Sequence, residues 1–128
     1  MIMDDLTQIV IGCAFEVHNE LGCGFLEKTY ENALLHELML RNIETQQQVP
    51  VNVTYKGNVV GEFVADIVVE NRLICELKAV SHILPVHEVQ LVNYLTATKI
   101  EVGLLINFSN SVEVKRKYRV FKKSCQSC

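Results

Sequence analysis

The stretch Phe63-Val-Ala-Asp66-Ile-Val-Val-Glu-Asn-Arg-Leu73-Ile-Cys-Glu76-Leu-Lys78-Ala-Val80 reads as two apolar strands joined by a short polar turn. Charge interrupts both strands, with Asp66 in the first and with Glu76 and Lys78 in the second. Antiparallel pairing across the turn brings Asp66 close to Glu76. Because side chains alternate along a strand, Glu76 and Lys78 share one face. We therefore expect two carboxylates and one ammonium group to gather on this sheet.

Such a group has a chemical use. Neighbouring carboxylates repel each other unless a cation or a proton lies between them. Mg²⁺ or Mn²⁺ would take one or two carboxylates and fill its other positions with water and substrate phosphate. Lys78 would orient or deprotonate a water, or stabilise charge on a phosphorane-like transition state. The alternative is an ordinary solvent-exposed strand face, although the apolar neighbours of Glu76 indicate burial on both faces, where unpaired charge is costly.

The segments around this hairpin predict an α/β fold. Upstream, the alternation from Val49 to Tyr55 predicts a strand, and Gly57-Asn58 predicts a two-residue turn into a strand from Val59 to about Val69. The third strand, Leu73 to Val80, completes an antiparallel meander. Downstream, Pro85 begins a helix that ends near Thr98.

The apolar run Val102–Asn107 predicts a buried strand, placed parallel to a meander strand by a right-handed crossover. Apolar spacing predicts two N-terminal helices, from Asp4 or Asp5 to about Leu21 and from about Phe25 to Arg41. The expected order is α-α-β-β-β-α-β, a mixed sheet flanked by helices, with a short element near Tyr118–Phe121.

The composition is that of one globular domain over residues 1–128, with 49% hydrophobic residues and a net charge of −3. No apolar run approaches the roughly 20 residues that span a bilayer, and the acidic start is unlike a secretory signal, so we expect a cytoplasmic protein without membrane contact. Five cysteines, an odd number, indicate reduced thiols. The terminal pair Cys125 and Cys128 supplies only half of a zinc site, and a frayed tail is the simpler interpretation.

The charge is unevenly distributed. Residues 1–114 carry six basic and fifteen acidic side chains, whereas residues 115–128 carry six basic and no acidic ones. We expect residues 115–128 to form a basic, flexible tail. Its first cations, Lys115, Arg116 and Lys117, would contact a phosphate backbone, or the tail would only keep the protein soluble.

Two motifs resemble a known family. Asp66 followed by Glu76-Leu77-Lys78 resembles the core of the PD-(D/E)XK nuclease superfamily, and Gly24-Phe-Leu-Glu27-Lys-Thr-Tyr30 resembles the motif of its GxxExxY family. Ala65 departs from the superfamily's proline, which shapes the strand rather than binding metal. The likeness extends from about Ile9 to Arg119 and includes the stretches 61–66, 76–80, 90–95 and 103–108.

The resemblance implies roles for individual residues. Asp66 and Glu76 would be metal ligands and Lys78 the catalytic lysine. Glu27 would reach the metal directly or through water, or else be a solvent-exposed helix acid. Three further residues complete the implied site: Gln90, Tyr94 and Tyr30.

Gln90 would contact the site or DNA, and Tyr94 lies one turn further along the same helix. A polar core contact is the alternative for both. Tyr30 would pack first, with a hydroxyl that touches the substrate.

The resemblance implies an Mg²⁺- or Mn²⁺-dependent nuclease acting on DNA with a restriction-endonuclease-like fold. The acidic body favours an alternative, a catalytically silent module that binds protein or nucleic acid. A homodimer that combines two basic tails, or a partner protein that delivers the substrate, would reconcile the acidic body with a nuclease.

Overall fold

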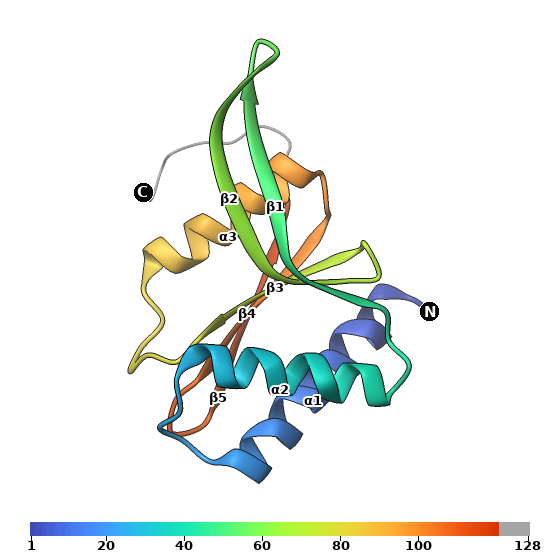
Figure 1. The fold of residues 1–128 in the computed structure, drawn as a ribbon, viewed down its shortest axis with the longest axis vertical. Coiled ribbons are helices and arrows are strands. Elements are labelled where there is room, and N and C mark those ends of the chain that lie inside the picture. Colours follow the sequence, from blue (N-terminus) through green and yellow to red (C-terminus); the bar gives the residue numbers. More distant parts are fainter. Residues whose placement is uncertain (121–128) are drawn as a thin grey trace.

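The computed structural model describes residues 1–120 and shows one five-stranded sheet between two helical layers (Figure 1). The strand order is β1-β2-β3-β4-β5; β3 and β4 are parallel, and the other neighbours are antiparallel. The predicted meander, crossover helix and parallel strand are therefore confirmed. The elements are α1 (Met3–Leu21), α2 (Glu27–Leu40), β1 (Thr45–Tyr55), β2 (Asn58–Val69), β3 (Leu73–Lys78), α3 (Pro85–Thr98), β4 (Val102–Phe108) and β5 (Val112–Tyr118).

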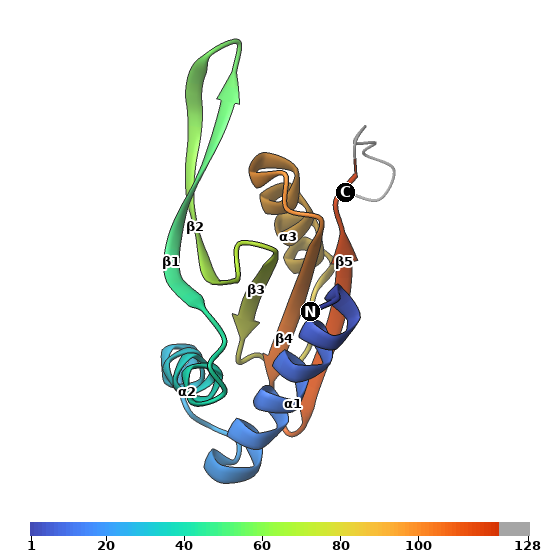
Figure 2. The same cartoon turned by 90° about the vertical axis from the view of Figure 1, so that its right-hand side faces the viewer.

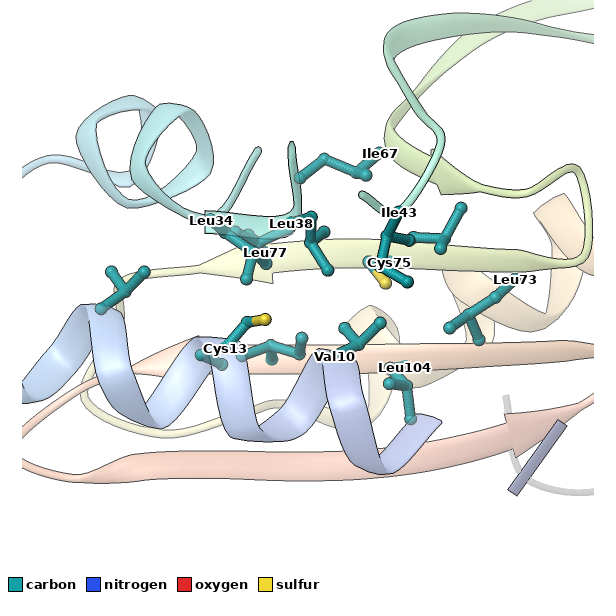
Figure 3. Close-up of a cluster of buried hydrophobic side chains, with 14 of the residues drawn as sticks. Val10, Cys13, Leu34, Leu38, Ile43, Ile67, Leu73, Cys75, Leu77 and Leu104 are labelled. Atoms are coloured by element: carbon teal, nitrogen blue, oxygen red, sulfur yellow. The ribbon is translucent and has the colours of Figure 1, made fainter. Parts of the chain in front are cut away.

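The sheet is buried on both faces around β3 and β4. On one face, α1 and α2 cover the alternate residues Leu73, Cys75 and Leu77 of β3 (Figure 3). On the other face, α3 covers Ile74 of β3 and Leu105 of β4. The central strands thus read as continuous apolar runs because both of their faces meet helices. Glu76 follows Ile74 by two residues on β3, so its side chain is on the face of the sheet that α3 covers.

The β1–β2 hairpin is longer than predicted and projects beyond the rest of the sheet (Figures 1 and 2). Its strand β1 begins at Thr45, so it includes three glutamines that precede the apolar alternation. Tyr55 pairs with Asn58, which makes Lys56-Gly57 the turn. The predicted turn was wrong by one residue: Lys56 and Gly57 both have positive φ, 49° and 85°, as a type I′ turn requires.

The prediction of a flexible segment from residue 115 was wrong for the first four residues. Lys115–Tyr118 belong to β5, which pairs with the whole length of β4. Val112 and Val114 pack against the α1–α2 core, and this alternation was obscured by the basic residues that follow it. Lys122, Lys123, Cys125 and Cys128 lie outside the described residues, as does the end of the element predicted near Tyr118–Phe121.

Within the described range, Cys13 and Cys75 are buried free thiols and Cys23 is an exposed one, as the odd cysteine count predicts. No helix formed by residues 1–120 has the length and apolarity needed to cross a membrane.

Gly103 sets the distance between α3 and β4, and its substitution tests the packing. A Cβ there would lie 2.8–3.1 Å from three side-chain carbons of Leu91. We expect Gly103→Ala to lower the free energy of unfolding by about 1–3 kcal/mol, because Leu91 must leave its position. Gly12→Ala is the control, since a Cβ on that exposed helical residue meets nothing closer than 4.0 Å. Urea unfolding that finds equal stability for both variants would contradict this packing.

Candidate active site

The pairing of β2 with β3 stops where the two acids face each other. It covers Val69 to Ile67 opposite Leu73 to Cys75, and the next opposed pair in that register is Asp66 and Glu76. At this pair, side-chain carboxylates take the place of main-chain carbonyls as the hydrogen-bond acceptors. The N–H of Asp66 donates to Oε2 of Glu76 at 2.7 Å, and the N–H of Leu77 donates to Oδ2 of Asp66 at 2.9 Å. The predicted proximity of the two acids is confirmed, and one oxygen of each is fixed by the neighbouring main chain.

Lys78 follows Glu76 by two residues and is in register with Asn107 of β4. The fully buried amide of Asn107 accepts from the N–H of Val80 and donates to its carbonyl, both at 2.9 Å. This clamp continues the contact between the two chain segments beyond the end of β3. Among residues 1–120, Lys78 forms no salt bridge, so its ammonium is available to a substrate.

The motif around Glu27 is built from backbone geometry and packing. Gly24 has a φ of 103°, which permits the turn before α2, and Glu27 is the first residue of that helix. Tyr30 donates from its hydroxyl to the Gly22 carbonyl at 2.6 Å and stacks on Phe108 with ring centroids 4.6 Å apart. The predicted contact of Tyr30 with substrate is not supported, because its side chain is fully buried. Tyr30 instead anchors the loop that presents Glu27.

The acidic groups carry an electrostatic cost. Burial, and then the charge of Asp66, raise the pKa of Glu76 from 4.5 to about 8. Burial also raises the pKa of Asp66, and burial followed by the charge of Asp66 raises that of Glu27. The positive charge of Lys78 acts on all three carboxyls in the opposite direction. The site is therefore poised to take up a proton or a cation.

The donor set fits a hard divalent ion. Among residues 1–120, no group of three or more acidic, histidine or cysteine side chains is placed to hold a metal ion. Mg²⁺ does not require one, because it binds through one or two carboxylates and keeps several waters. Asp66 and Glu76 supply such a pair, and Glu27 lies within electrostatic range of both.

Sequence reasoning missed two residues beside Asp66. Glu31, 2% exposed, accepts hydrogen bonds from the amides of Gln47 and Gln48 at 2.6 and 2.9 Å. Gln48 lies opposite Asp66 in the register of β1 and β2, and its amide also hydrogen-bonds with Asp66, which lowers the pKa of that carboxyl. Its φ of 55° is unusual for a residue other than glycine. The three consecutive glutamines before Val49 were the available signal.

Gln90 and Tyr94 of α3 form a pair on the same face of the sheet as Glu76. The amide of Gln90 donates to the Tyr94 hydroxyl at 2.9 Å. Burial, and then the charge of Glu76, raise the pKa of Tyr94. The structure thus brings this pair into the electrostatic environment of the carboxylates.

The three predicted cations of β5 lie elsewhere. Lys115, Arg116 and Lys117 are separated from β2 by β3 and β4, about 14 Å across the sheet. Arg116 donates to Thr7 Oγ1 at 2.8 Å and pairs with an exposed Asp4 carboxylate, and Lys117 pairs with Glu88 at 3.1 Å. The structure does not bring these residues to the acids, so it does not support their predicted contact with substrate there.

The raised pKa of Glu76 predicts how stability varies with pH in the metal-free protein. The folded state binds more protons than the unfolded state between about pH 4.5 and about pH 8. The stability that the folded state gains by keeping Glu76 protonated is therefore complete at low pH. It is lost as the pH rises through the pKa of Glu76 in the folded state. We expect Glu76→Gln to raise the free energy of unfolding by about 2–4 kcal/mol near pH 9 and much less near pH 5. Urea unfolding titrations in EDTA at both pH values measure this change in the free energy of unfolding.

Glu62→Gln is the matched control, because Glu62 is an exposed acid on the same hairpin strand as Asp66. A gain near pH 9 as large in this control as in Glu76→Gln, or no gain in either, would contradict the electrostatic cost assigned to Glu76.

Gln48 can be tested by separating its backbone from its side chain. We expect Gln48→Ala to cost about 1–3 kcal/mol of stability, because buried Glu31 loses a donor. Gln48→Gly should cost about 1 kcal/mol less, because glycine accepts a positive φ without strain. Gln46→Ala, on the exposed neighbouring glutamine, should be nearly neutral. Equal losses in the alanine and glycine variants would show that the backbone at this position is unstrained.

Comparisons with known proteins identify the family. The family model described as the PD-(D/E)XK nuclease superfamily matches residues 4–119. No curated protein matches the sequence. Solved structures with a similar fold include SSO0001, with a TM-score of 0.59 and 20% identity over 74% of this chain and 50% of that one.

An alkaline exonuclease, LHK-Exo from Laribacter hongkongensis, is also similar, with a TM-score of 0.52 and 10% identity over 67% of this chain and 52% of that one. This chain thus spans about half the length of both solved proteins, and at these identities the likeness concerns the fold. The match over nearly the whole described range, together with the fold, shows that the chain belongs to the PD-(D/E)XK nuclease superfamily.

Proposed function

We propose that this protein hydrolyses phosphodiester bonds in DNA with Mg²⁺ or Mn²⁺, and that it belongs to the GxxExxY branch of its superfamily. One observation carries the proposal: the buried carboxylate of Glu76 and the half-buried carboxylate of Asp66 meet where β2 and β3 separate, each fixed by a main-chain N–H, with an ammonium group nearby that forms no salt bridge within residues 1–120. The repulsion between these two carboxylates destabilises the fold unless a bound cation relieves it.

Asp66 and Glu76 would hold the ion, and Glu27 would reach it directly or through water. A divalent ion bound there would polarise the scissile phosphate and lower the pKa of a bound water. The main-chain bonds from Asp66 and Leu77 leave one oxygen of each carboxylate for this purpose. They also fix the two groups before substrate arrives, which reduces the reorganisation that binding requires.

Lys78 is the proposed catalytic lysine. Its ammonium would bind a non-bridging phosphate oxygen and stabilise the negative charge that develops on it, or orient the attacking water. The clamp between Asn107 and Val80 restrains the chain just beyond Lys78. Gln90, held by Tyr94, would contact the phosphate or the sugar from the helix above.

One observation favours a second candidate, a silent module that binds a partner without hydrolysis. Acids outnumber bases strongly in residues 1–114, and two of the cations of β5 pair with acids of the same chain. Nucleases that bind duplex backbones usually present basic surface. The intact set of Asp66, Glu76 and Lys78 favours catalysis over this candidate.

Calorimetric titration with Mn²⁺ and cleavage assays on DNA test the proposal together. We expect the wild type to bind Mn²⁺ and cleave, and Asp66→Ala and Glu76→Ala to lose both, because each removes a ligand. Lys78→Ala should still bind Mn²⁺ and cleave about 10²–10³-fold more slowly.

Glu62→Ala, which removes an exposed acid from β2, should behave as wild type. Mn²⁺ binding that survives both ligand substitutions would contradict the metal site. Binding without cleavage by the wild type would establish the silent module instead.

A further inference from the structure

A groove of about 580 Å³ lies between the projecting β1–β2 hairpin and α3. Figure 2 shows the hairpin rising beside α3, away from α1 and α2. Phe63 of β2 and Tyr94 of α3 face each other in it, with ring centroids 5.9 Å apart and ring planes at 41°. Tyr94 is buried, whereas Phe63 is 44% exposed, so part of the Phe63 side chain remains open to a ligand.

The groove shares Gln90 and Tyr94 with the candidate active site. Gln90 lines it and is the residue that holds the Tyr94 hydroxyl. Phe63 precedes Asp66 by three residues on the same strand, a separation of about 10 Å. A strand of nucleic acid spans that distance with about three stacked nucleotides, or fewer when extended.

The lining chemistry matches a nucleobase. Phe63 offers a flat aromatic surface, and Asn52 and Asn93 offer amides that both donate and accept hydrogen bonds, as base edges do. Lys99 supplies a positive charge for a phosphate, and within the described part of the chain no acidic residue lines the groove. Aromatic platforms beside amides and a cation are typical of sites that bind unpaired bases.

The charge distribution argues against a duplex at this place. Binding a duplex depends on many lysine and arginine contacts to phosphates. Among residues 1–120, Lys99 is the only cation that lines the groove, and the basic strand β5 lies at the far edge of the sheet, with Arg116 and Lys117 in salt bridges. Affinity must then come mainly from stacking, which a paired and stacked base does not offer.

We propose that this groove binds single-stranded nucleic acid, with a base stacked on Phe63 within about three nucleotides of the phosphate held at Asp66 and Glu76. The inference rests on the proposed function for the position of that phosphate. It adds the substrate class: a single strand, or the frayed end of a duplex.

Tryptophan fluorescence reports the stacking without requiring catalysis. The chain has no tryptophan, so Phe63→Trp introduces a single one that keeps an aromatic face in the groove. Val64→Trp is the matched control, because Val64 is the next residue on the strand, is 46% exposed and does not line the groove. We expect short oligo-deoxythymidine to quench Phe63→Trp strongly and Val64→Trp weakly.

An abasic oligonucleotide of the same length should quench neither variant, because it offers phosphates without bases. Oligo-uridine then distinguishes RNA from DNA as the source of the base. Equal quenching of the two variants, no quenching at all, or equal quenching by a blunt duplex would overturn the proposal. In the absence of quenching, the groove is left to a ligand of another class, such as a partner's peptide.

A second measurement uses a protein without the new tryptophan. We expect Phe63→Ala to weaken binding of a labelled oligo-deoxythymidine by about tenfold in anisotropy titrations, with Phe63→Tyr close to wild type. Hydrolysis of bis(p-nitrophenyl) phosphate, which is too small to use the groove, tests the active site separately and should be unchanged in the control Val64→Ala. If the wild type hydrolyses neither the oligo-deoxythymidine nor bis(p-nitrophenyl) phosphate, the proposed function fails. The quenching result still decides whether the groove binds a single strand. If Phe63→Ala retains full affinity for the single strand, the groove proposal fails alone.

Discussion

The arrangement of this site depends on one exchange of hydrogen-bond partners between β2 and β3. At Asp66 and Glu76, two main-chain N–H groups donate to carboxylates of the opposite strand rather than to its carbonyls. The exchange ends the ladder, separates the strands and holds the buried Glu76 beside the half-buried Asp66. The cost is visible in the raised pKa values of both carboxyls, and it is the same repulsion that makes the site suited to a cation.

The rest of the fold keeps that exchange in register. Leu73, Cys75 and Leu77 insert into the core formed by α1 and α2, so a slip of β3 by one residue would drive Glu76 into that core. On the other side of the strand, β4 pairs with β3 over its whole length. The stability of an apolar core thus fixes the position of a group of charges that by itself would push the strands apart.

The proposed catalytic group and the proposed substrate-binding groove occupy different parts of the same face. The carboxylates lie where the sheet divides, and the groove between the β1–β2 hairpin and α3 includes Tyr94, which lies within electrostatic range of both. The hairpin is therefore more than a connection, because its outer part forms one wall of that groove. The excess of acidic residues in the chain disfavours binding through many phosphate contacts. It is compatible with recognition of unpaired bases through an aromatic ring and amides.

The sequence by itself determined the meander of β1, β2 and β3 and the meeting of Asp66 with Glu76, because these follow from alternation and a short turn between neighbouring segments. It did not reveal the contacts of Gln48 with Glu31, the inward position of Tyr30 or the pairing of Arg116 with Asp4, 112 residues away. Those depend on how α1 and α2 lie against the sheet. Local periodicity decides which face a side chain occupies, but only the packing of distant segments decides what it meets there.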